Sequence, residues 1–419
     1  MHLPRHRLIL AVGLAAVLAA TGCSTKAVDP SASSSADKLA TGPGVTDTTI
    51  KLGVLTDRTG PYAGLGKAVE QGRTLFWEDK NSKGGICGHK IEFVLKDHGY
   101  NPQNAVTAYA AIKDDVLALH ELLGSPEIAA LLDSIKSDEM LTGALSWSSS
   151  LLTNPYVVIT GTTYDVEMIN AVDYLVKNKG LVKGDKIGHI FHEGDYGENG
   201  YAGAVAAAKE YGLELLPYKI KPTTTDLTAQ VTALKAAGAK AVLLTVAPAQ
   251  AASAVGVAAA GGYAVPFIAN APSFSTALLA TTAKPALEKQ LYISTSIAPF
   301  SSSANGPTTV RTAFVAKYPD ATKIQYAMFG YAQAQVMAGI LETACKNNDL
   351  TRAGLLKAFQ SQTNISTNGL IAPVDFSKPG AIPARQSYIL RPDSTSPGGL
   401  SQAQDLFAAP LAQSYNPTH

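Results

Sequence analysis

The sequence carries little charge of either sign and few cysteines. Charged residues make up 16% of the 419 residues, and 34 basic side chains nearly balance 33 acidic ones. This balance gives no reason to expect nucleic acid or an anionic surface as a partner. Of the three cysteines, neither Cys87 nor Cys345 has a second cysteine or a histidine at ligand spacing, so no metal site is predicted. No cofactor is expected either.

Common hydrolase motifs are also missing. There is no Gly-x-Ser-x-Gly elbow and no His-Glu-x-x-His pair. The one dense cluster of catalytic residue types is His189, His192, Glu193 and Asp195. On a strand, His189 and His192 would point to opposite faces, which disfavours a shared metal. We therefore expect structural or surface histidines and no enzyme; a hydrolase that loses turnover in His192→Ala is the alternative.

Long apolar runs are absent beyond the N-terminus. Arg5, His6 and Arg7 precede an apolar run from Leu8 to Ala20, which is typical of an export signal. The run is shorter than the roughly 20 residues that a membrane-spanning helix needs. We therefore interpret residues 1–22 as a signal peptide rather than a transmembrane anchor.

The end of this segment indicates a lipid anchor. Ala20-Thr21-Gly22-Cys23 resembles a bacterial lipobox, in which the cysteine becomes the acylated first residue. Residues 23–44 are rich in serine and poor in bulky apolar side chains, as in a flexible tether. The prediction is a protein anchored to the cell membrane through a lipid on Cys23, on the extracytoplasmic face. An ordinary secreted protein is the alternative.

The rest of the chain alternates between short β-branched runs and longer amphipathic ones. The predicted strands are 50–55, 91–95, 116–122, 156–159, 186–191, 213–220 and 241–246. The predicted helices are 65–79, 104–114, 166–178, 201–211, 227–237 and 328–346. This repeated order favours parallel sheets with helices on both faces and ligand sites at the carboxyl ends of the strands.

The length after the signal peptide is too great for one ordinary core. We predict an α/β fold of two Rossmann-like, doubly wound parallel-sheet lobes joined by a hinge of several chain crossings. Lobe one is assigned residues 45–160 plus 298–372, and lobe two residues 161–297 plus 373–395. Residues 396–419 are expected to form a loose tail.

Several stretches together resemble the type I periplasmic binding proteins, in particular the branched-chain amino-acid-binding group of transport receptors. The matching stretches are Thr59-Gly60-Pro61-Tyr62-Ala63, Gly84-Gly85-Ile86, Tyr196-Gly197 and Gly330-Tyr331-Ala332. The resemblance implies a monomeric solute-binding subunit of an ABC importer that closes on a small molecule and delivers it to a membrane permease. A receptor that serves a signalling partner would share the fold and is an alternative.

The loop from Thr59 to Gly66 joins a strand to a helix, so its glycines let the backbone approach a ligand and the helix start offers N–H donors. It is not a nucleotide-binding loop, because its glycine spacing is wrong and Ala68 stands where Ser or Thr is required.

Two further strand ends carry hydroxyl groups. Ser125 and Pro126 suit the start of a helix, and capping alone would explain them. In the resembling family this loop also binds the ligand carboxylate. Three hydroxyls beside Trp147 suit a pocket that bonds one end of a ligand and stacks on its body, although a buried core tryptophan is the plainer interpretation.

In the second lobe, the family places an aromatic lid where Tyr196 stands; a half-exposed turn tyrosine is the alternative. The predicted ligand contacts are Tyr62, Ser125, Pro126, Ser146, Trp147, Ser148, Ser149, Tyr196, Ala247 and Ser273.

Two stretches of the second lobe depart from the family pattern in a way that bears on the ligand. Branched-chain receptors use an acidic residue of the second lobe to pair with the ligand ammonium, but the stretches 245–248 and 270–274 contain no carboxylate. An unpaired buried ammonium would cost several kcal/mol. We therefore expect a carboxylate or neutral ligand, unless Glu127, Glu193 or Asp195 supplies the counter-charge.

The two cysteines that remain after Cys23 are expected to pair, because the compartment outside the membrane is oxidising. A Cys87–Cys345 disulfide is the prediction, and two buried thiols are the alternative.

Overall fold

The chain's structure is a computed structural model, and it describes residues 39–417. The predicted signal peptide, Cys23 and most of the predicted tether lie outside the described residues. Within the described part, no helix has both the length and the apolar character that crossing a bilayer requires.

Five parallel strands form the first sheet, in the order β3-β2-β4-β5-β6. The strands are β2 (Thr49–Thr56), β3 (Lys90–Asp97), β4 (Ala118–Leu123), β5 (Thr142–Leu145) and β6 (Val157–Ile159). Every residue of β4 is buried, as expected of a central strand with helices on both faces of its sheet.

The helices around this sheet come from two separate parts of the chain. The early ones are α1 (Ala63–Ser82), α2 (Pro102–Ala110), α3 (Ser125–Ala129), α4 (Leu132–Ser137) and the 3-10 helix η1 (Ser149–Thr153). The late ones are α10 (Asn305–Lys317), α11 (Tyr326–Lys346) and α12 (Arg352–Gln360). Two short strands, β1 (Ala40–Thr41) and β12 (Asp349–Leu350), pair beside them.

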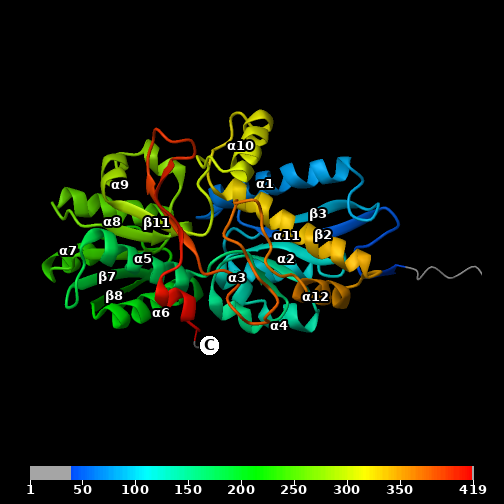
Figure 1. Cartoon of the computed structure of the whole chain (residues 1–419), viewed down its shortest axis with the longest axis horizontal. Helices are drawn as coiled ribbons and strands as arrows, with labels where there is room; N and C mark the ends of the chain where they lie inside the picture. Colours follow the sequence, from blue (N-terminus) through cyan, green and yellow to red (C-terminus); the bar gives the residue numbers. More distant parts are fainter. Residues whose placement is uncertain (1–38, 418–419) are drawn as a thin grey trace, which may run out of the picture. The chain divides into compact units, whose positions relative to one another are not determined.

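Glycines bring α1 and α11 into close contact. A Cβ on Gly72 would lie 2.0 Å from the carbonyl oxygen of Ala327, and one on Gly330 would lie 2.2 Å from that of Val69. Each helix therefore presents a glycine to the backbone of the other, and no larger residue fits at either position. Figure 1 shows α11 in yellow running beside α1 in blue.

A polar pair lies inside lobe one. The guanidinium of Arg73 on α1 pairs with the carboxylate of Glu121 on β4, and both side chains are almost completely buried. Beside them, the indole of Trp77 donates to Nε2 of His120 over 3.1 Å. Both contacts join α1 to β4 of the first sheet.

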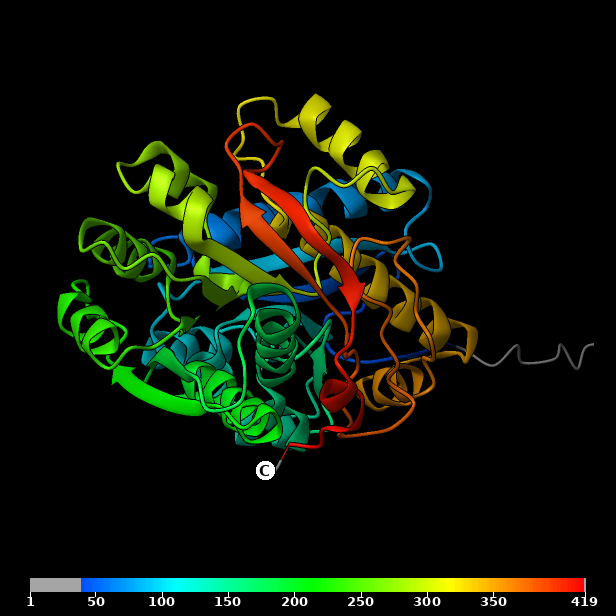
Figure 2. The ribbon, with the colours of Figure 1, turned by 60° about the vertical axis from the view of Figure 1, so that its left-hand side comes forward.

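Seven strands form the second sheet, in the order β14-β13-β11-β10-β9-β7-β8. Its parallel part contains β7 (Lys186–His192), β8 (Glu214–Ile220), β9 (Ala241–Thr245), β10 (Phe267–Asn270) and β11 (Leu291–Thr295). The edge beside β11 is covered by an antiparallel hairpin of β13 (Ser387–Pro392) and β14 (Leu400–Phe407), seen in Figure 2 as two long orange and red strands.

The helices of the second sheet alternate with its strands. They are α5 (Tyr164–Lys179), α6 (Asp195–Tyr211), α7 (Thr228–Ala236), α8 (Pro248–Ala260), α9 (Lys284–Gln290), the 3-10 helices η2 (Ala271–Ser273) and η3 (Thr276–Ala280), and the terminal α13 (Pro410–Ser414). The predicted α/β fold with two parallel sheets is therefore confirmed.

The predicted loose tail is wrong for most of its length. Residues 400–407 form β14, and residues 410–414 form α13. The backbone N–H of Ala409 also donates to the side chain of Asn170 on α5 over 2.8 Å. β14 is an edge strand with exposed polar side chains. Its composition is therefore similar to that of an unstructured tail.

The chain crosses between the sheets three times, and the crossings are bonded to one another. The N–H of Thr162 in the first crossing donates to the hydroxyl of Ser296 in the second over 3.2 Å. The Thr162 hydroxyl donates to the carbonyl of Gln386 in the third over 2.6 Å. These crossings divide the described chain into lobe one, residues 39–159 and 297–376, and lobe two, residues 164–295 and 387–417.

Cys87 and Cys345 are joined by a disulfide, with Cα atoms 6.5 Å apart. The bond connects the turn before β3 to the last turn of α11, and so ties an early and a late part of lobe one together.

Candidate functional site

A pocket with a cavity volume of about 20 Å³ lies where strand ends of the two sheets meet. Eight of its lining residues belong to lobe one and three to lobe two. They are Tyr62, Leu65, Tyr100, Leu123, Gly124, Ser125, Leu145 and Trp147 of lobe one, and Tyr164, Tyr196 and Pro272 of lobe two. Most follow the carboxyl ends of β2, β3, β4, β5, β7 and β10, which is the rule for ligand sites in parallel α/β sheets.

Aromatic rings form the walls of the pocket. The rings of Tyr62 and Tyr100 in lobe one lie 4.6 Å apart between centroids. In lobe two, Tyr164 and Tyr196 lie 4.7 Å apart, and Tyr164 also meets Trp147 of lobe one at 6.0 Å. All five rings are at least half buried, so they enclose a largely apolar space.

The polar groups around this space are mostly neutral. The hydroxyls of Ser125 and Ser146 lie 2.6 Å apart, at the ends of β4 and β5. Trp147 donates its indole N–H to the carbonyl of Thr160 over 2.9 Å, so only the apolar part of its ring is available to a ligand. The hydroxyl of Tyr62 is buried and has no partner among the described residues.

The loop before α1 is held by Asp57. Its carboxylate accepts from the backbone N–H groups of Thr59, Gly60 and Tyr62, at 3.1 Å for Thr59 and 2.8 Å for Tyr62. These three N–H groups are therefore not available to a ligand. What the loop gives to the pocket is the side chain of Tyr62.

Of the three predicted alternatives for a counter-charge, only Glu127 remains near the pocket with its carboxyl group unengaged. Glu193 is exposed at the turn after β7. Asp195 accepts from the hydroxyl of Ser150, across the two lobes. Glu127 is completely buried on α3, and neither of its carboxyl oxygens has a hydrogen-bond partner in the described chain. Burial, together with the negative charge of Asp57, raises the pKa of Glu127 to about 8.

Sequence reasoning missed a second buried acid, Glu167 on α5. Its carboxylate accepts from the side-chain amide of Asn270 over 2.8 Å and approaches the N–H of Ala271 at 3.4 Å. Burial raises its pKa to about 8. Unlike Glu127, Glu167 has partners that hold it against β10, so it organises lobe two.

Hydrogen bonds join the lobes beside the pocket. The side-chain amide of Asn199 on α6 donates to the hydroxyl of Ser149 over 2.8 Å. The same hydroxyl donates to the carboxylate of Asp165 on α5 over 2.6 Å. Burial raises the pKa values of both Asp165 and Asp195. Ser149 and Ser150 thus connect lobe one to two helices of lobe two.

The structure places the predicted ligand contacts in two groups. Tyr62, Ser125, Trp147 and Tyr196 line the pocket. The others stand behind it or beside it: Ser146 bonds Ser125, Ser148 pairs with Ser150, Ser149 joins the lobes, Ser273 bonds Val246, and Pro126 and Ala247 begin helices.

Several lining residues were not predicted, among them Tyr100 and Tyr164. Tyr100 follows β3 in a turn where its φ is +54°, and Tyr164 is the first residue of α5 after the first crossing. Their position directly after a strand or a crossing was the only signal in the sequence.

The two histidines of β7 are each engaged within lobe two. Nε2 of His189 lies 2.9 Å from the hydroxyl of Thr245, and Nε2 of His192 meets the side chain of Gln250. Both are buried, and burial lowers both pKa values, that of His189 to about 3.

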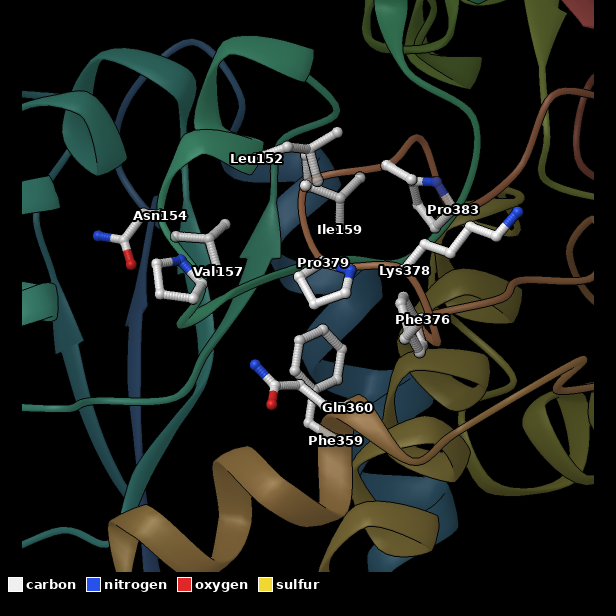
Figure 3. A pocket seen from close by; sticks show the side chains of 13 residues that line it. Leu152, Asn154, Val157, Ile159, Phe359, Gln360, Phe376, Lys378, Pro379 and Pro383 are labelled. Carbon is white, nitrogen blue, oxygen red and sulfur yellow. The ribbon is translucent and has the colours of Figure 1, made fainter.

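A second cavity, of about 30 Å³, lies under the third crossing and shares no lining residue with the first. In Figure 3 the side chains of Ile159 and Leu152 face Pro379 and Phe359 across it. Its lining is mainly apolar, and Lys378 is exposed at its edge.

Comparison with known proteins gives three results. Residues 49–397 match the sequence profile of the periplasmic binding protein family. A fatty acid ABC transporter substrate-binding protein from Thermomonospora curvata is 42% identical, with a TM-score of 0.88 over 90% of this chain and 97% of that one. A branched-chain amino acid ABC transporter protein from Thermus thermophilus with bound valine shares the fold, with a TM-score of 0.76 over 88% of this chain and 99% of that one, at 18% identity.

Among curated proteins, the Leu/Ile/Val-binding protein homolog 3 of Brucella melitensis is 28% identical over 198 residues. That match spans 46% of this chain and 53% of the relative, so the chain spans about half the length of the curated relatives it matches.

Proposed function

Since the chain belongs to the periplasmic binding protein family, we propose that it is the lipid-anchored, extracytoplasmic solute-binding subunit of an ABC importer, with a short aliphatic or aromatic carboxylate as its ligand. Amides of similar shape are weaker ligands of the same pocket. The ligand binds between the lobes, and the loaded form docks on a membrane permease. The protein performs no chemistry on the ligand.

The single observation that carries the ligand class is the lining of the inter-lobe pocket. Leucine side chains and aromatic rings predominate, and no lining residue is basic or acidic. An α-amino acid would place an ammonium group in this space, where no ionised carboxylate lines the wall, at a cost of several kcal/mol. The fatty acid named for the 42% identical relative supports an aliphatic carboxylate.

The size of the pocket favours a short chain. The cavity volume of about 20 Å³ is far below that of open small-molecule sites, so a ligand enters as the lobes separate, and a short chain needs less separation than a long one. Leu65, Leu123 and Leu145 give the apolar surface for the hydrocarbon part, and the hydroxyls of Ser125 and Tyr62 lie within the same pocket as partners for a head group. Closure buries the ligand and changes the surface that the permease contacts.

A thermal-shift screen of the protein from Ser24 onward tests the ligand class. The set contains butanoate, hexanoate, octanoate, phenylacetate, hexanamide and leucine. A ligand at 100 times its Kd stabilises the fold by about 2.7 kcal/mol, which raises the Tm by several degrees. We expect the carboxylates to raise the Tm and leucine to leave it unchanged. A shift with leucine and none with the carboxylates would refute the proposal.

The lipid anchor has its own test, because Cys23 lies outside the described residues. Cells that express the full chain should retain it in the membrane fraction with the mass of an acylated Cys23. The variant Cys23→Ala should lose that mass and should not be processed before residue 23. If the wild type is released without an acyl group, it is an ordinary secreted protein.

A further inference from the structure

Glu127 is a buried acid whose carboxyl oxygens have no hydrogen-bond partner in the described chain, and it lies directly behind Gly124 in the wall of the inter-lobe pocket. A Cβ placed on Gly124 would lie 1.9 Å from Oε2 of Glu127 and 2.8 Å from the carboxyl carbon of the same residue. Gly124 itself lines the pocket, with φ at +102°. The carboxyl group therefore occupies the space of the side chain that Gly124 lacks, and a residue with a Cβ at this position would displace it.

The groups that face Glu127 supply no positive charge. Asp57, at the end of β2, is negative and already accepts three backbone N–H groups. Tyr62, in the loop before α1, and Tyr100, after β3, are neutral phenols whose pKa values are raised by burial. His98, also after β3, has its pKa lowered by burial and is neutral above pH 7. From lobe two, the pocket receives the phenols of Tyr164 and Tyr196, whose pKa values burial also raises.

A carboxylate that enters this pocket meets the hydroxyls of Ser125 and Tyr62 but no cation among the lining residues, so it needs a stronger donor. A neutral carboxylic acid meets this need, because an O–H···O⁻ bond to a carboxylate is short and about twice as strong as a bond between neutral groups. An ionised Glu127 would instead repel the ligand. Its burial and the adjacent Asp57 favour the neutral form.

We propose that Glu127 is a specificity-determining residue of the inter-lobe pocket, and that in its neutral acid form it donates its carboxyl proton in a hydrogen bond to the carboxylate of the ligand. This inference rests on the proposed function and refines its ligand class to carboxylates that bind together with one proton. The proton stays between the two carboxyl groups, so no bond other than this hydrogen bond forms or breaks. Below the pKa of Glu127 the free protein already carries the proton that the bound state needs. Above that pKa, binding of each ligand takes up one proton from the solvent.

Titration of octanoate into the soluble protein by calorimetry, from pH 6 to pH 9.5, tests the inference. Octanoate itself is ionised throughout, because carboxylic acids titrate well below pH 6. We expect constant affinity from pH 6 to about 7.5 and a loss approaching tenfold per pH unit above about 8. At pH 9, binding should take up close to one proton, measured from the heats in two buffers of different ionisation enthalpy.

Two variants separate Glu127 from other titrating groups. Glu127→Gln keeps a donor at every pH, so its octanoate affinity should not change with pH. Glu92→Gln, on the exposed side of β3, is the matched control and should reproduce the wild-type profile. Proton uptake by the wild type needs no variant, so it remains decisive even if Glu127→Gln does not fold.

Three outcomes would contradict this inference, and they distinguish its failure from a failure of the proposed function. Octanoate binding that is independent of pH in the wild type would overturn this inference and leave the proposed function standing. Octylamine binding that strengthens as the pH rises toward 8 and is lost in Glu127→Gln would make Glu127 a counter-charge for a cation, and would also overturn it. No binding of any carboxylate at pH 6 would overturn the proposed ligand class, and this inference with it.

Discussion

Asn199 on α6 of lobe two donates its side-chain amide to the hydroxyl of Ser149 in lobe one over 2.8 Å, and its side-chain oxygen accepts from the N–H of Ser149 at 3.3 Å. One side chain of lobe two is thus bonded twice to one residue of lobe one. The pair is buried and does not line the pocket, so its contribution to binding would be through lobe closure.

Asn199→Ala removes both bonds and should weaken octanoate binding by roughly 5- to 150-fold, because two buried hydrogen bonds of about 0.5–1.5 kcal/mol each favour the closed form. Calorimetry measures the affinity, and small-angle scattering should show a larger radius for the variant with ligand. Asn178→Ala, on the exposed end of α5, is the control. Equal affinities for the two variants would show that this contact does not favour closure.

Tyr196→Ala should lower the affinity for octanoate by roughly 10- to 100-fold, because removing a buried aromatic side chain forfeits about 1.5–3 kcal/mol. Tyr196→Phe is the matched control. The Tyr196 hydroxyl makes only long contacts of 3.4 Å to Val246 and Ser273, so its loss should change the affinity by less than about threefold. A large loss in the Phe variant would mean that the hydroxyl, rather than the ring, holds the ligand.

His189 should make the protein sensitive to acid. Its pKa is lowered to about 3 in the fold, whereas a histidine in the unfolded chain titrates near 6.5. As the pH falls below 6.5 the unfolded chain takes up the proton first, so stability is lost from about pH 6.5 down to about pH 3. Between pH 7 and pH 4.5, wild type should lose about 2–3 kcal/mol more than His189→Gln in urea unfolding. Parallel losses in the two proteins would contradict this.

The disulfide should stabilise lobe one without affecting the ligand. Replacing Cys87 and Cys345 by serine should lower the free energy of unfolding by about 2–5 kcal/mol. Octanoate affinity should not change, because neither cysteine lines the pocket. Melting curves with and without a reducing agent test this: reductant should lower the Tm of the wild type and leave the double variant unchanged.

The sequence predicts the alternating strands and helices because apolar residues recur at a different spacing in a strand than in a helix. The strand predicted at 50–55 is observed at Thr49–Thr56, and the helix predicted at 328–346 is observed at Tyr326–Lys346. Where the pattern is weak the prediction fails. β14 has a polar, exposed face and only the short helix α13 after it, so its residues look like a tail until the pairing with β13 is known.

The site was predicted less completely, for a physical reason. Strand ends identify the loops that reach the cleft, and Tyr62, Ser125, Trp147 and Tyr196 come from such loops. Local sequence does not say which of several neighbouring hydroxyls faces the ligand. Ser148 turns toward Ser150 two residues later, and Ser149 turns toward Asn199, which only the approach of lobe two brings near.

The antiparallel hairpin of β13 and β14 has a consequence for biogenesis. It pairs with β11, whose own residues end nearly a hundred positions earlier, so β11 has an open edge until the last part of the chain has been made. An unpaired edge of this kind is a template for association between chains. A product that stops before Ser387 would therefore retain most of the ligand pocket and yet be prone to aggregation, a defect that is removed only at the very end of synthesis.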